Sequence, residues 1–382
     1  MLYIRVSHLL TPTKTLNDAA LLIDAGKISM VAESARLKLP AGTQVIDATG
    51  LIAAPGFIDW QLNGGFGMDF TENPASIWDV AARLPEHGVT SFLPTIITAP
   101  LDVYARAQSV LGKGAPTGFS GALPLGLHFE GPFLNPGKKG AHNPAYLRSP
   151  DLSDTASWSR KNHLWLVTLA PELPGALDLV RMLRLREVIV SAGHSLATYE
   201  QAREAFSAGV TCATHLFNAM PGLDHRAPGL AAALLDDPRL TVGLIPDGIH
   251  VHPAMVRLAW KLKGARGMAI VTDAMMALGM APGEYVLGDY KVSVNETSAR
   301  LADGTLAGSI LQMDVAVQNL VKFTGCTLDE AITSATYSVA QMLGARGKGR
   351  LAPGADADVV LLDETGKLMA TIVRGTVVYS KL

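Results

Sequence analysis

The stretch VIVSAGHSLATYEQAREAFSAGVTCATHLFN, residues 188–218, decides the fold of this chain. It contains two apolar runs, VIVSAG and GVTCAT, followed by His194 and His215 respectively. Between them, Leu196–Ala208 has the apolar spacing of an amphipathic helix. A strand, a crossover helix and a second strand form a parallel, right-handed unit. The pattern therefore places both imidazoles at the carboxyl ends of parallel strands, where α/β folds carry their chemistry.

Similar apolar runs lie on both sides of this unit, which gives eight within about 220 residues. They do not alternate polar and apolar residues, as expected of strands that are covered on both faces. Most are followed by a segment with helical spacing. The chain is therefore predicted to be an α/β protein with a (β/α)8 barrel of the TIM type. The eight predicted strands are Ile52–Trp60, Val89–Ile97, Leu123–Phe129, Leu164–Ala170, Glu187–Ala192, Gly209–Thr214, Leu240–Pro246 and Gly267–Thr272.

The connecting segments complete the predicted barrel. A turn-rich, β-like insert is expected at Glu284–Leu306, after the eighth strand. Helical spacing is found both between the strands and after this insert. The predicted helices, besides the one already described, are Ala75–His87, Leu101–Leu111, Ala176–Arg186, Pro253–Lys263, Ile310–Phe323 and Thr327–Leu343.

The two ends of the chain have a different pattern of short β-type runs separated by turns. They could form two unrelated ribbons, but an isolated two-stranded ribbon is marginal in water. We therefore expect a small β-sandwich domain built from residues 1–52 and 349–382, next to a catalytic barrel of residues 53–348. Its predicted strands are Leu21–Asp24, Lys27–Val31, Gln44–Asp47, Val359–Leu362, Met369–Val373 and Val377–Tyr379.

Composition excludes several classes of protein. The net charge of −2 does not favour nucleic acid as a partner. Two cysteines, Cys212 and Cys326, are too few for a disulfide framework and fit a reducing cytosol. No signal peptide is recognised at the N-terminus, and no run is long and apolar enough to span a membrane. We expect a cytoplasmic protein without a membrane partner.

Polar residues at the predicted strand ends indicate a metal site, because in a closed barrel they all face one mouth. Glu130, His194 and His215 form a two-histidine, one-carboxylate set that leaves a coordination position open for water. Zinc is the first expectation. Asp273 closes the apolar run MAIVTD and is the candidate general base; the alternative is that it caps a helix. The other strand-end residues are Asp59, Gln61, Asn63, His128, Asn218, Asp247 and His250.

Several motifs, taken in order and spacing, resemble the amidohydrolase superfamily and, within it, the family of N-acetylglucosamine-6-phosphate deacetylases. The resemblance covers nearly the whole chain. The motifs are PGFIDWQLNG (55–64), HFEGPF (128–133), KGAH (139–142), GHS (193–195), THLFNAM (214–220), RAPG (226–229), DGIH (247–250), VTDA (271–274), LAGS (306–309) and GRLAPGADADVVLLD (349–363).

The resemblance implies a catalytic barrel with a small terminal β-sandwich, metal ligation by Glu130, His194 and His215, and a catalytic Asp273. It also implies hydrolysis of the acetamide of a small amino-sugar phosphate, and a homodimer in which a neighbouring chain helps to close the site. Sugar-phosphate contacts are implied for Ala141, His142, Asn218, Ala219, Arg226, His250, Leu306, Ala307 and Gly308.

The chain departs from many members of the superfamily at the end of the first barrel strand. Those members carry His-x-His there, for a second metal, whereas this chain has Gln61 and Asn63. The fourth strand, LWLVTLAPE, has no lysine that could bridge two metals as a carbamate. We therefore expect one divalent ion per subunit, with Fe, Co and Mn as alternatives to Zn.

The residues themselves say less about the substrate. Arg226 has the planar fork that suits a phosphate, but a surface salt bridge in the stretch Asp224-His225-Arg226 is an equal alternative. His142 lies in a long loop and is a candidate to polarise the scissile carbonyl. Two other functions stay open: a different amidohydrolase, acting on cyclic amides or N-acyl amino acids, and a catalytically silent barrel used for binding.

Overall fold

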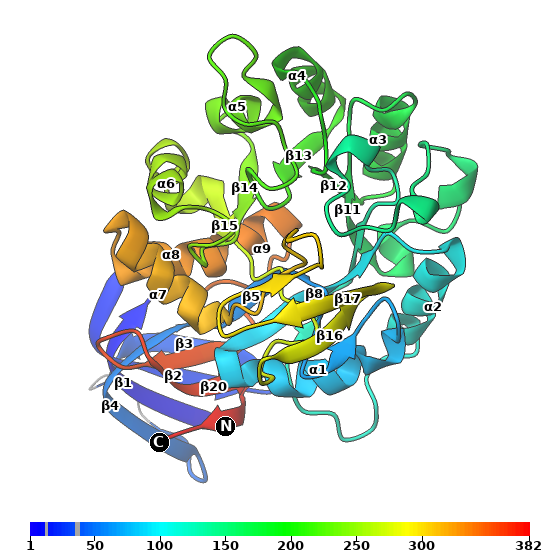
Figure 1. The fold of residues 1–382 in the computed structure, drawn as a ribbon. Helices are drawn as coiled ribbons and strands as arrows, with labels where there is room; N and C mark the ends of the chain where they lie inside the picture. Colours follow the sequence, from blue (N-terminus) through cyan, green and yellow to red (C-terminus); the bar gives the residue numbers. More distant parts are fainter. Residues whose placement is uncertain (12–13, 35–38) are drawn as a thin grey trace.

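The centre of the molecule is an eight-stranded parallel sheet coiled into a barrel (Figure 1). The computed structural model describes residues 1–11, 14–34 and 39–382; residues 12, 13 and 35–38 of the predicted terminal domain lie outside this description. The predicted (β/α)8 barrel is confirmed. The strands are β5 (Phe57–Leu62), β8 (Val89–Ile97), β10 (Leu127–Glu130), β11 (Leu164–Leu169), β12 (Ile189–Ala192), β13 (Val210–Ala213), β14 (Thr241–Leu244) and β15 (Met268–Ile270).

The barrel closes between its first and last strands through backbone bonds just beyond β15. Asp273 N donates to the carbonyl oxygen of Gln61 at 2.9 Å, and Asn63 N donates to that of Ala274 at 2.8 Å. Leu62 and Ala274 form a parallel bridge at the same place. This seam fixes the ends of β5 and β15 side by side, so the polar residues that follow both strands face the same mouth.

Helices surround the barrel, and their ends follow capping signals in the sequence. The helix expected to begin at Leu196 begins only at Tyr199, because the hydroxyl of Thr198 accepts from Gln201 N in a capping box. The segment expected as one helix over Thr327–Leu343 is divided at Thr336, whose φ of −136° and ψ of −82° are not helical. The helices are α1 (Ile77–Arg83), α2 (Leu101–Gly112), α3 (Ala176–Leu185), α4 (Tyr199–Ala208), α5 (Gly229–Asp236), α6 (Pro253–Gly267), α7 (Met313–Thr324), α8 (Leu328–Ala335) and α9 (Tyr337–Leu343).

Short 3-10 turns complete the connections. They flank α1 and take the place of an α-helix between β10 and β11. The turns are η2 (Pro74–Ser76), η3 (Leu84–His87), η4 (Pro136–Lys138), η5 (Pro144–Tyr146), η6 (Ser153–Thr155) and η7 (Arg160–Asn162). None of the helices in the described part of the chain is long and apolar enough to cross a membrane.

Two predicted barrel strands are wrong in extent. The run Ile52–Trp60 is continuous in hydrophobicity, but residues up to Pro55 end strand β4 of another sheet, and β5 begins only at Phe57. The chain passes from one sheet to the other at Gly56. A side chain at this position would collide with Thr90, so only glycine fits there. The run Leu123–Phe129 is likewise split into β9 (Leu123–Pro124) and β10.

The two ends of the chain form one seven-stranded sheet, as the predicted pairing of the termini requires. Its order is β21-β20-β19-β4-β1-β2-β3, and β4 joins the two ends by pairing antiparallel with β19. Both termini therefore lie close together at this sheet (Figure 1). The strands are β1 (Leu2–Leu10), β2 (Thr15–Asp24), β3 (Lys27–Glu33), β4 (Gln44–Pro55), β19 (Val359–Leu362), β20 (Leu368–Val373) and β21 (Thr376–Ser380).

Strand β19 connects the cores of the two sheets. Val359 and Leu361 belong to the apolar cluster of the terminal sheet, whereas Val360 and Leu362 belong to the main cluster of the barrel. All four side chains are fully buried. Because successive side chains of a strand point to opposite faces, this one strand is packed by both cores.

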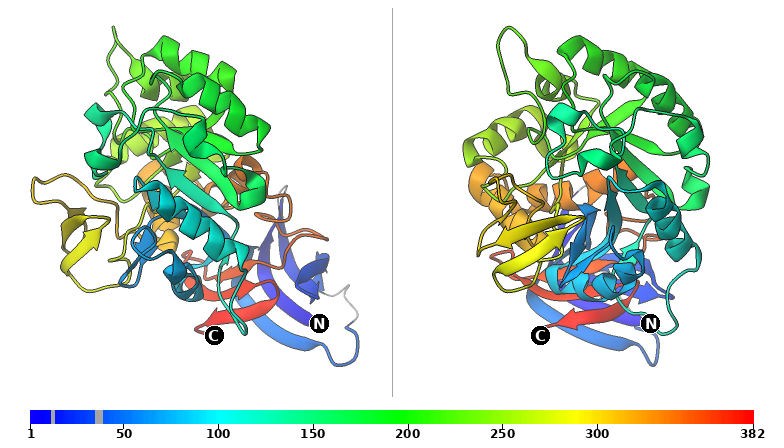
Figure 2. Two further views of the ribbon diagram at one scale, coloured as in Figure 1. Left: turned by 90° about the vertical axis from the view of Figure 1, so that its right-hand side faces the viewer. Right: turned by 45° about the vertical axis from the view of Figure 1, so that its right-hand side comes forward.

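A small antiparallel sheet lies at the other side of the barrel (Figure 2). It consists of β16 (Gly283–Leu287), β17 (Tyr290–Val294) and β18 (Ala299–Arg300), which confirms the β-like insert expected at Glu284–Leu306. A two-stranded ribbon, β6 (Gly64–Gly65) with β7 (Met68–Asp69), follows β5. The left view of Figure 2 places the insert and the terminal sheet on opposite sides of the barrel.

Candidate active site

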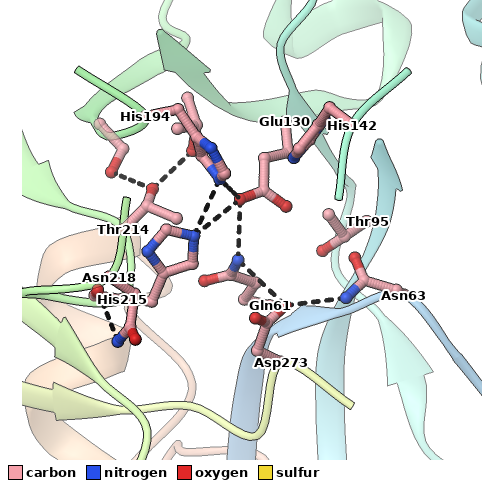
Figure 3. A network of polar contacts seen from close by, with 12 residues as sticks. Gln61, Asn63, Thr95, Glu130, His142, His194, Thr214, His215, Asn218 and Asp273 are labelled. Atoms are coloured by element: carbon pink, nitrogen blue, oxygen red, sulfur yellow. Dashed lines mark hydrogen bonds and ion pairs between the residues drawn. The ribbon is translucent and has the colours of Figure 1, made fainter. Parts of the chain in front are cut away.

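Three ligand atoms converge at the carboxyl ends of β10, β12 and β13 (Figure 3). Nε2 of His194 and Nε2 of His215 lie 3.0 Å apart, and each is 3.1 Å from Oε1 of Glu130. The three side chains are buried. The structure therefore brings together the two-histidine, one-carboxylate set that the sequence predicts.

The chemistry of this set fits a divalent cation. His194 Nδ1 lies 2.8 Å from the carbonyl oxygen of Lys138, an acceptor only, so Nδ1 carries the proton and Nε2 presents a lone pair. That lone pair faces a carboxylate oxygen, and the two acceptors need a positive charge between them. A tetrahedral ion with bonds of about 2.0–2.2 Å separates its ligands by roughly 3.3–3.5 Å, close to the separations found here.

The electrostatics of the three side chains point the same way. Burial acts to raise the pKa of Glu130, but the positive charge and N–H groups that the imidazoles of His194 and His215 can offer hold it well below its ordinary value. Burial acts to lower the pKa of His215, but the hydrogen bond and charge of Glu130 raise it. The carboxylate is therefore ionised, and its surroundings favour a cation.

Asp273 lies beside this set and is held by two side-chain amides (Figure 3). Asn63 Nδ2 donates to Asp273 Oδ1 at 2.8 Å. Gln61 Nε2 donates to the same oxygen at 3.2 Å and to Glu130 Oε1 at 3.1 Å. No helix begins at Asp273, so the alternative that it caps a helix is wrong. One amide group thus joins the candidate base to a candidate metal ligand.

Burial gives Asp273 the pKa of a useful base. Loss of solvent, followed by the negative charge of Glu130, raises the pKa of Asp273 to about 6. A carboxylate that takes up and releases a proton works best with a pKa near the operating pH. The environment of Asp273 suits this role.

His142 is a neutral hydrogen-bond donor at the edge of the set. The backbone N–H of Thr98 donates to His142 Nδ1 at 3.2 Å, so the proton of the neutral ring is on Nε2. Burial, followed by the charge of His194, lowers the pKa of His142 to about 3, which keeps the ring neutral at pH 7. The ring packs edge to face on that of His194 with centroids 4.5 Å apart.

Three of these residues have strained backbones. The φ angles of His194, His215 and Asp273 are 50°, 28° and 49°, in the left-handed region that side chains other than glycine seldom adopt. Such residues cost of order 1–3 kcal/mol each and gather at functional sites. The chain turns sharply at the ends of three strands, and this turns the side chains into the mouth.

A layer of buried polar side chains lies within the barrel below the ligands. Oγ1 of Thr95 is 3.1 Å from Nδ1 of His128, whose Nε2 is 2.8 Å from Oγ1 of Thr168. The chain continues through Thr214 to Ser191 with distances of 2.6 and 2.7 Å. Burial lowers the pKa of His128 to about 4. His128 is thus a neutral structural histidine, and Thr214 immediately precedes His215, a candidate metal ligand.

A cavity of about 290 Å³ opens over the set. Two of the implied sugar-phosphate contacts lie elsewhere. Ala307 is fully buried, and Arg226 lies in an exposed loop, where its backbone N–H donates to Asp224 Oδ1. Neither lines this cavity. The implied contacts that do line it are Ala141, His142, Asn218, Ala219, His250, Leu306 and Gly308.

Sequence reasoning missed other residues of this cavity. The sequence around Lys138 predicts a solvated lysine whose charge could steer an anionic substrate. In the structure its Nζ donates to the carbonyl oxygen of Met220 at 3.0 Å, and the residue lines the cavity. Ile97 and Leu287 carry no polar signal, and they reach the cavity only through the tertiary fold. Among the sequence signals, only the lysine pair Lys138-Lys139, which leads into the KGAH segment, could have indicated that this loop lines the cavity.

The chain belongs to the amidohydrolase family, whose model matches residues 52–378. Relatives within this family narrow the comparison. The chain is 42% identical over 351 residues to N-acetylglucosamine-6-phosphate deacetylase of Homo sapiens. This match covers 87% of this chain and 85% of the human protein. It is 39% identical over 364 residues to N-acetylgalactosamine-6-phosphate deacetylase of Escherichia coli O157:H7, covering 94% of each.

A solved structure is similar over the whole length of the chain. It is a mutant of N-acetyl-D-glucosamine-6-phosphate deacetylase from Mycobacterium smegmatis in complex with N-acetyl-D-glucosamine-6-phosphate. The TM-score is 0.90 at 33% identity, and the match covers 99% of each chain. The likeness therefore includes both the terminal sheet and the barrel.

Proposed function

We propose that the protein hydrolyses the acetamide of N-acetylglucosamine 6-phosphate to glucosamine 6-phosphate and acetate, in amino-sugar catabolism or recycling. The observation that carries this proposal is the convergence of Glu130, His194 and His215 beside Asp273 in one buried cavity. The names of the relatives support the choice of substrate. A catalytically silent barrel is disfavoured, because the complete set is present.

Glu130, His194 and His215 would hold one divalent ion, with Zn first and Fe, Co or Mn as alternatives. Such an ion, when bound, lowers the pKa of a water molecule and polarises the substrate carbonyl. Gln61 and Asn63 donate N–H groups to carboxylates at the place where a second cation would need ligands. Their amides therefore favour a single ion.

The chain's own residues supply the proton transfers. Asp273 Oδ2 makes no hydrogen bond with the described residues, whereas Oδ1 is held by two amides. Oδ2 takes the proton of the attacking water, and the same carboxyl then gives it to the amide nitrogen as the C–N bond breaks. The Nε2–H of His142 is placed to donate to the carbonyl oxygen as negative charge develops there.

The polar end of the cavity suits the sugar phosphate. Lys138 and His250 bring positive charge or N–H groups, and Asn218 adds an amide. His250 Nδ1 is 2.6 Å from Asp247 Oδ2, which fixes the ring. Arg226 is exposed in this chain. We propose that it contacts the phosphate of a neighbouring subunit in a homodimer, because an exposed guanidinium is free to reach a second chain.

We also propose a division into two domains, a terminal β domain of residues 1–52 with 349–382 and a catalytic barrel of residues 53–348. The separate apolar clusters of the two sheets support this division. A cytoplasmic location is proposed as well. Its support is the pair of free, buried cysteines, Cys212 and Cys326, which fits a reducing compartment.

The test is acetate release by the purified, metal-replete protein. N-acetylglucosamine 6-phosphate, its galacto epimer and the unphosphorylated sugar are compared at equal concentration. The proposal expects fast turnover of the phosphorylated glucosamine derivative and much slower turnover of the unphosphorylated sugar. Equal turnover of both would remove the phosphate site. Preference for the epimer would move the assignment to the activity named for the Escherichia coli relative. Turnover of hydantoins or N-acetyl amino acids instead would support another amidohydrolase.

A further inference from the structure

A second cavity lies beside the catalytic one. It has a volume of about 200 Å³, and it shares three lining residues with the catalytic cavity: Ile97, Ala141 and Leu287. All three side chains are apolar. Ile97 and Leu287 are buried, with only 5% and 4% of their surfaces exposed. We call these three residues the apolar wall, since they line one cavity on one side and the other cavity on the other side.

The apolar wall is held in place by the turn between β16 and β17. Gly288 N donates to Asp69 Oδ2 at 3.3 Å, and Asn143 Nδ2 donates to Asp289 Oδ2 at 2.7 Å. The turn packs tightly on the barrel, because a Cβ built on Gly288 would lie 3.3 Å from Ile97 Cδ1. The hairpin therefore holds Leu287, the residue before Gly288, against the barrel at a fixed position.

The apolar wall lies across the mouth from the polar end of the cavity. Ile97 is paired in register with Glu130. Ala141 immediately precedes His142, the candidate hydrogen-bond donor to the substrate carbonyl. Asn218 and His250 follow β13 and β14, which lie three or four places from β8 around the eight-stranded barrel. The close view likewise places Asn218 on the opposite side of the metal ligands from His142 and Asn63 (Figure 3).

We propose that the apolar wall is the acyl subsite and that Leu287 sets the greatest length of the N-acyl group. This inference rests on the proposed function. With the carbonyl at the catalytic residues and the phosphate at the Lys138 and His250 end, the methyl of the acetyl group must point away from the sugar, toward Ile97 and Leu287. A longer acyl chain meets Leu287, and the second cavity beyond it offers further space.

The test compares N-acetyl, N-propionyl and N-butyryl glucosamine 6-phosphate as substrates of the wild type and of Leu287→Ala. One methylene in an apolar pocket changes kcat/KM by about 10- to 200-fold. The wild type should therefore disfavour the butyryl substrate, and Leu287→Ala should raise the butyryl-to-acetyl ratio of kcat/KM by at least about 10-fold. The shortened side chain joins the two cavities, which admits the longer chain.

The matched control is Val292→Ala. Val292 is fully buried in the same apolar cluster as Leu287, on strand β17, but it lines neither cavity. This variant loses apolar packing in the hairpin, as Leu287→Ala does, and its ratio of butyryl to acetyl turnover should equal that of the wild type. A shift equal to that of Leu287→Ala would assign the effect to a loosened hairpin and overturn the proposal.

Other outcomes separate this inference from the function on which it rests. If the wild type releases acetate but Leu287→Ala keeps the wild-type acyl preference, the apolar wall is not the acyl subsite. If Leu287→Ala does not fold, Ile97→Val makes the same test by its propionyl-to-acetyl ratio, which must rise for the proposal to stand. If the wild type releases no acyl group from any of the sugar phosphates, the proposed function fails first.

Discussion

Two parts of the barrel rim carry buried polar side chains of opposite hydrogen-bonding character. On the half formed by β10, β12 and β13, Glu130, His194 and His215 direct lone pairs and negative charge at one point. On the half formed by β5, Gln61 and Asn63 direct N–H groups at carboxylates. The first half therefore attracts a cation, and the second half stabilises the same kind of negative charge without one.

Asp273 lies where the two halves meet, because the amide of Gln61 donates both to Asp273 and to Glu130. A cation next to its carboxylate would lower the pKa, because an opposite charge favours the ionised form. In the chain without an ion, burial raises the pKa of the Asp273 carboxyl to about 6, and the amide donors oppose this rise. An ion held by Glu130, His194 and His215 would lower this pKa again. Each of the following variants changes one side chain in or below the rim, or serves as a control outside it, from the largest expected effect to the smallest.

Glu130→Ala removes the carboxylate from the cation-binding half. Two neutral imidazoles alone bind a divalent ion much more weakly, so both the metal content and the activity should fall to background. Metal analysis of the purified variant, together with its thermal unfolding, checks this result. A variant that keeps one ion per subunit would show that the ion binds elsewhere.

Asp273→Asn removes the base and leaves the cation-binding half unchanged. General acid–base groups contribute about 10²- to 10⁴-fold, so kcat should fall by that factor while the metal content stays at the wild-type value. Steady-state kinetics and metal analysis on one preparation measure both quantities. Near-normal kcat in this variant would remove Asp273 from the mechanism.

Gln61→Met removes one of the two amides of the second half, with its bonds to Asp273 and Glu130, while keeping the length of the side chain. In the wild type, activity should fall on the acidic side of the pH profile, because a protonated Asp273 cannot accept a proton. Loss of an N–H donor disfavours the ionised carboxylate, so this acidic limb should move to higher pH. The measurement is the pH profile of kcat.

Gln108→Met is the matched control for that shift. Gln108 is a buried amide on α2 that donates to the carbonyl oxygens of Ser157 and Asn162, away from the cavity. Its acidic limb should coincide with that of the wild type. An equal movement in both variants would indicate a general effect of losing a buried amide.

Asp59→Asn tests how a buried carboxyl on β5, the strand that carries Gln61, contributes to stability. Burial raises the pKa of Asp59 to about 7, so the folded state binds a proton that the unfolded state releases near pH 4. This contribution to stability is present below about pH 4 and is lost as the pH rises to about 7. The variant should therefore lose less stability than the wild type between pH 5 and 8, by on the order of 2 kcal/mol, with kcat nearly unchanged.

Denaturant unfolding at both pH values measures that difference. Asparagine mimics the protonated acid, since it can still accept from Thr272 N and interact with the Thr272 hydroxyl. Identical pH dependence in the variant and the wild type would mean that Asp59 is ionised throughout.

The sequence predicts the barrel and the convergence of the ligands because both follow from local patterns. Each histidine comes directly after an apolar run, and the crossover rule alone brings His194 and His215 to one edge. The protonated nitrogen of His142 could not be predicted in this way. It depends on a hydrogen bond from Thr98, 44 residues earlier in the chain.

The errors have equally physical causes. Pro55 and Phe57 lie in one continuous apolar run, and only their hydrogen-bond partners in different sheets separate them. Leu287 reads as an ordinary residue of an exposed β insert, because its position beside Ile97 is set by the turn at Gly288. Hydrophobicity predicts that such residues are buried, but it does not tell which surface they bury.

Strand β19 has a consequence for synthesis on the ribosome. Its partner β4 is complete about 300 residues before β19 emerges, and at about 5–20 residues per second that interval lasts roughly 15–60 seconds. During this time one edge of β4, and the barrel face that receives Val360 and Leu362, have no partner. A nascent chain of this protein therefore needs protection from aggregation until almost its last residues have been added.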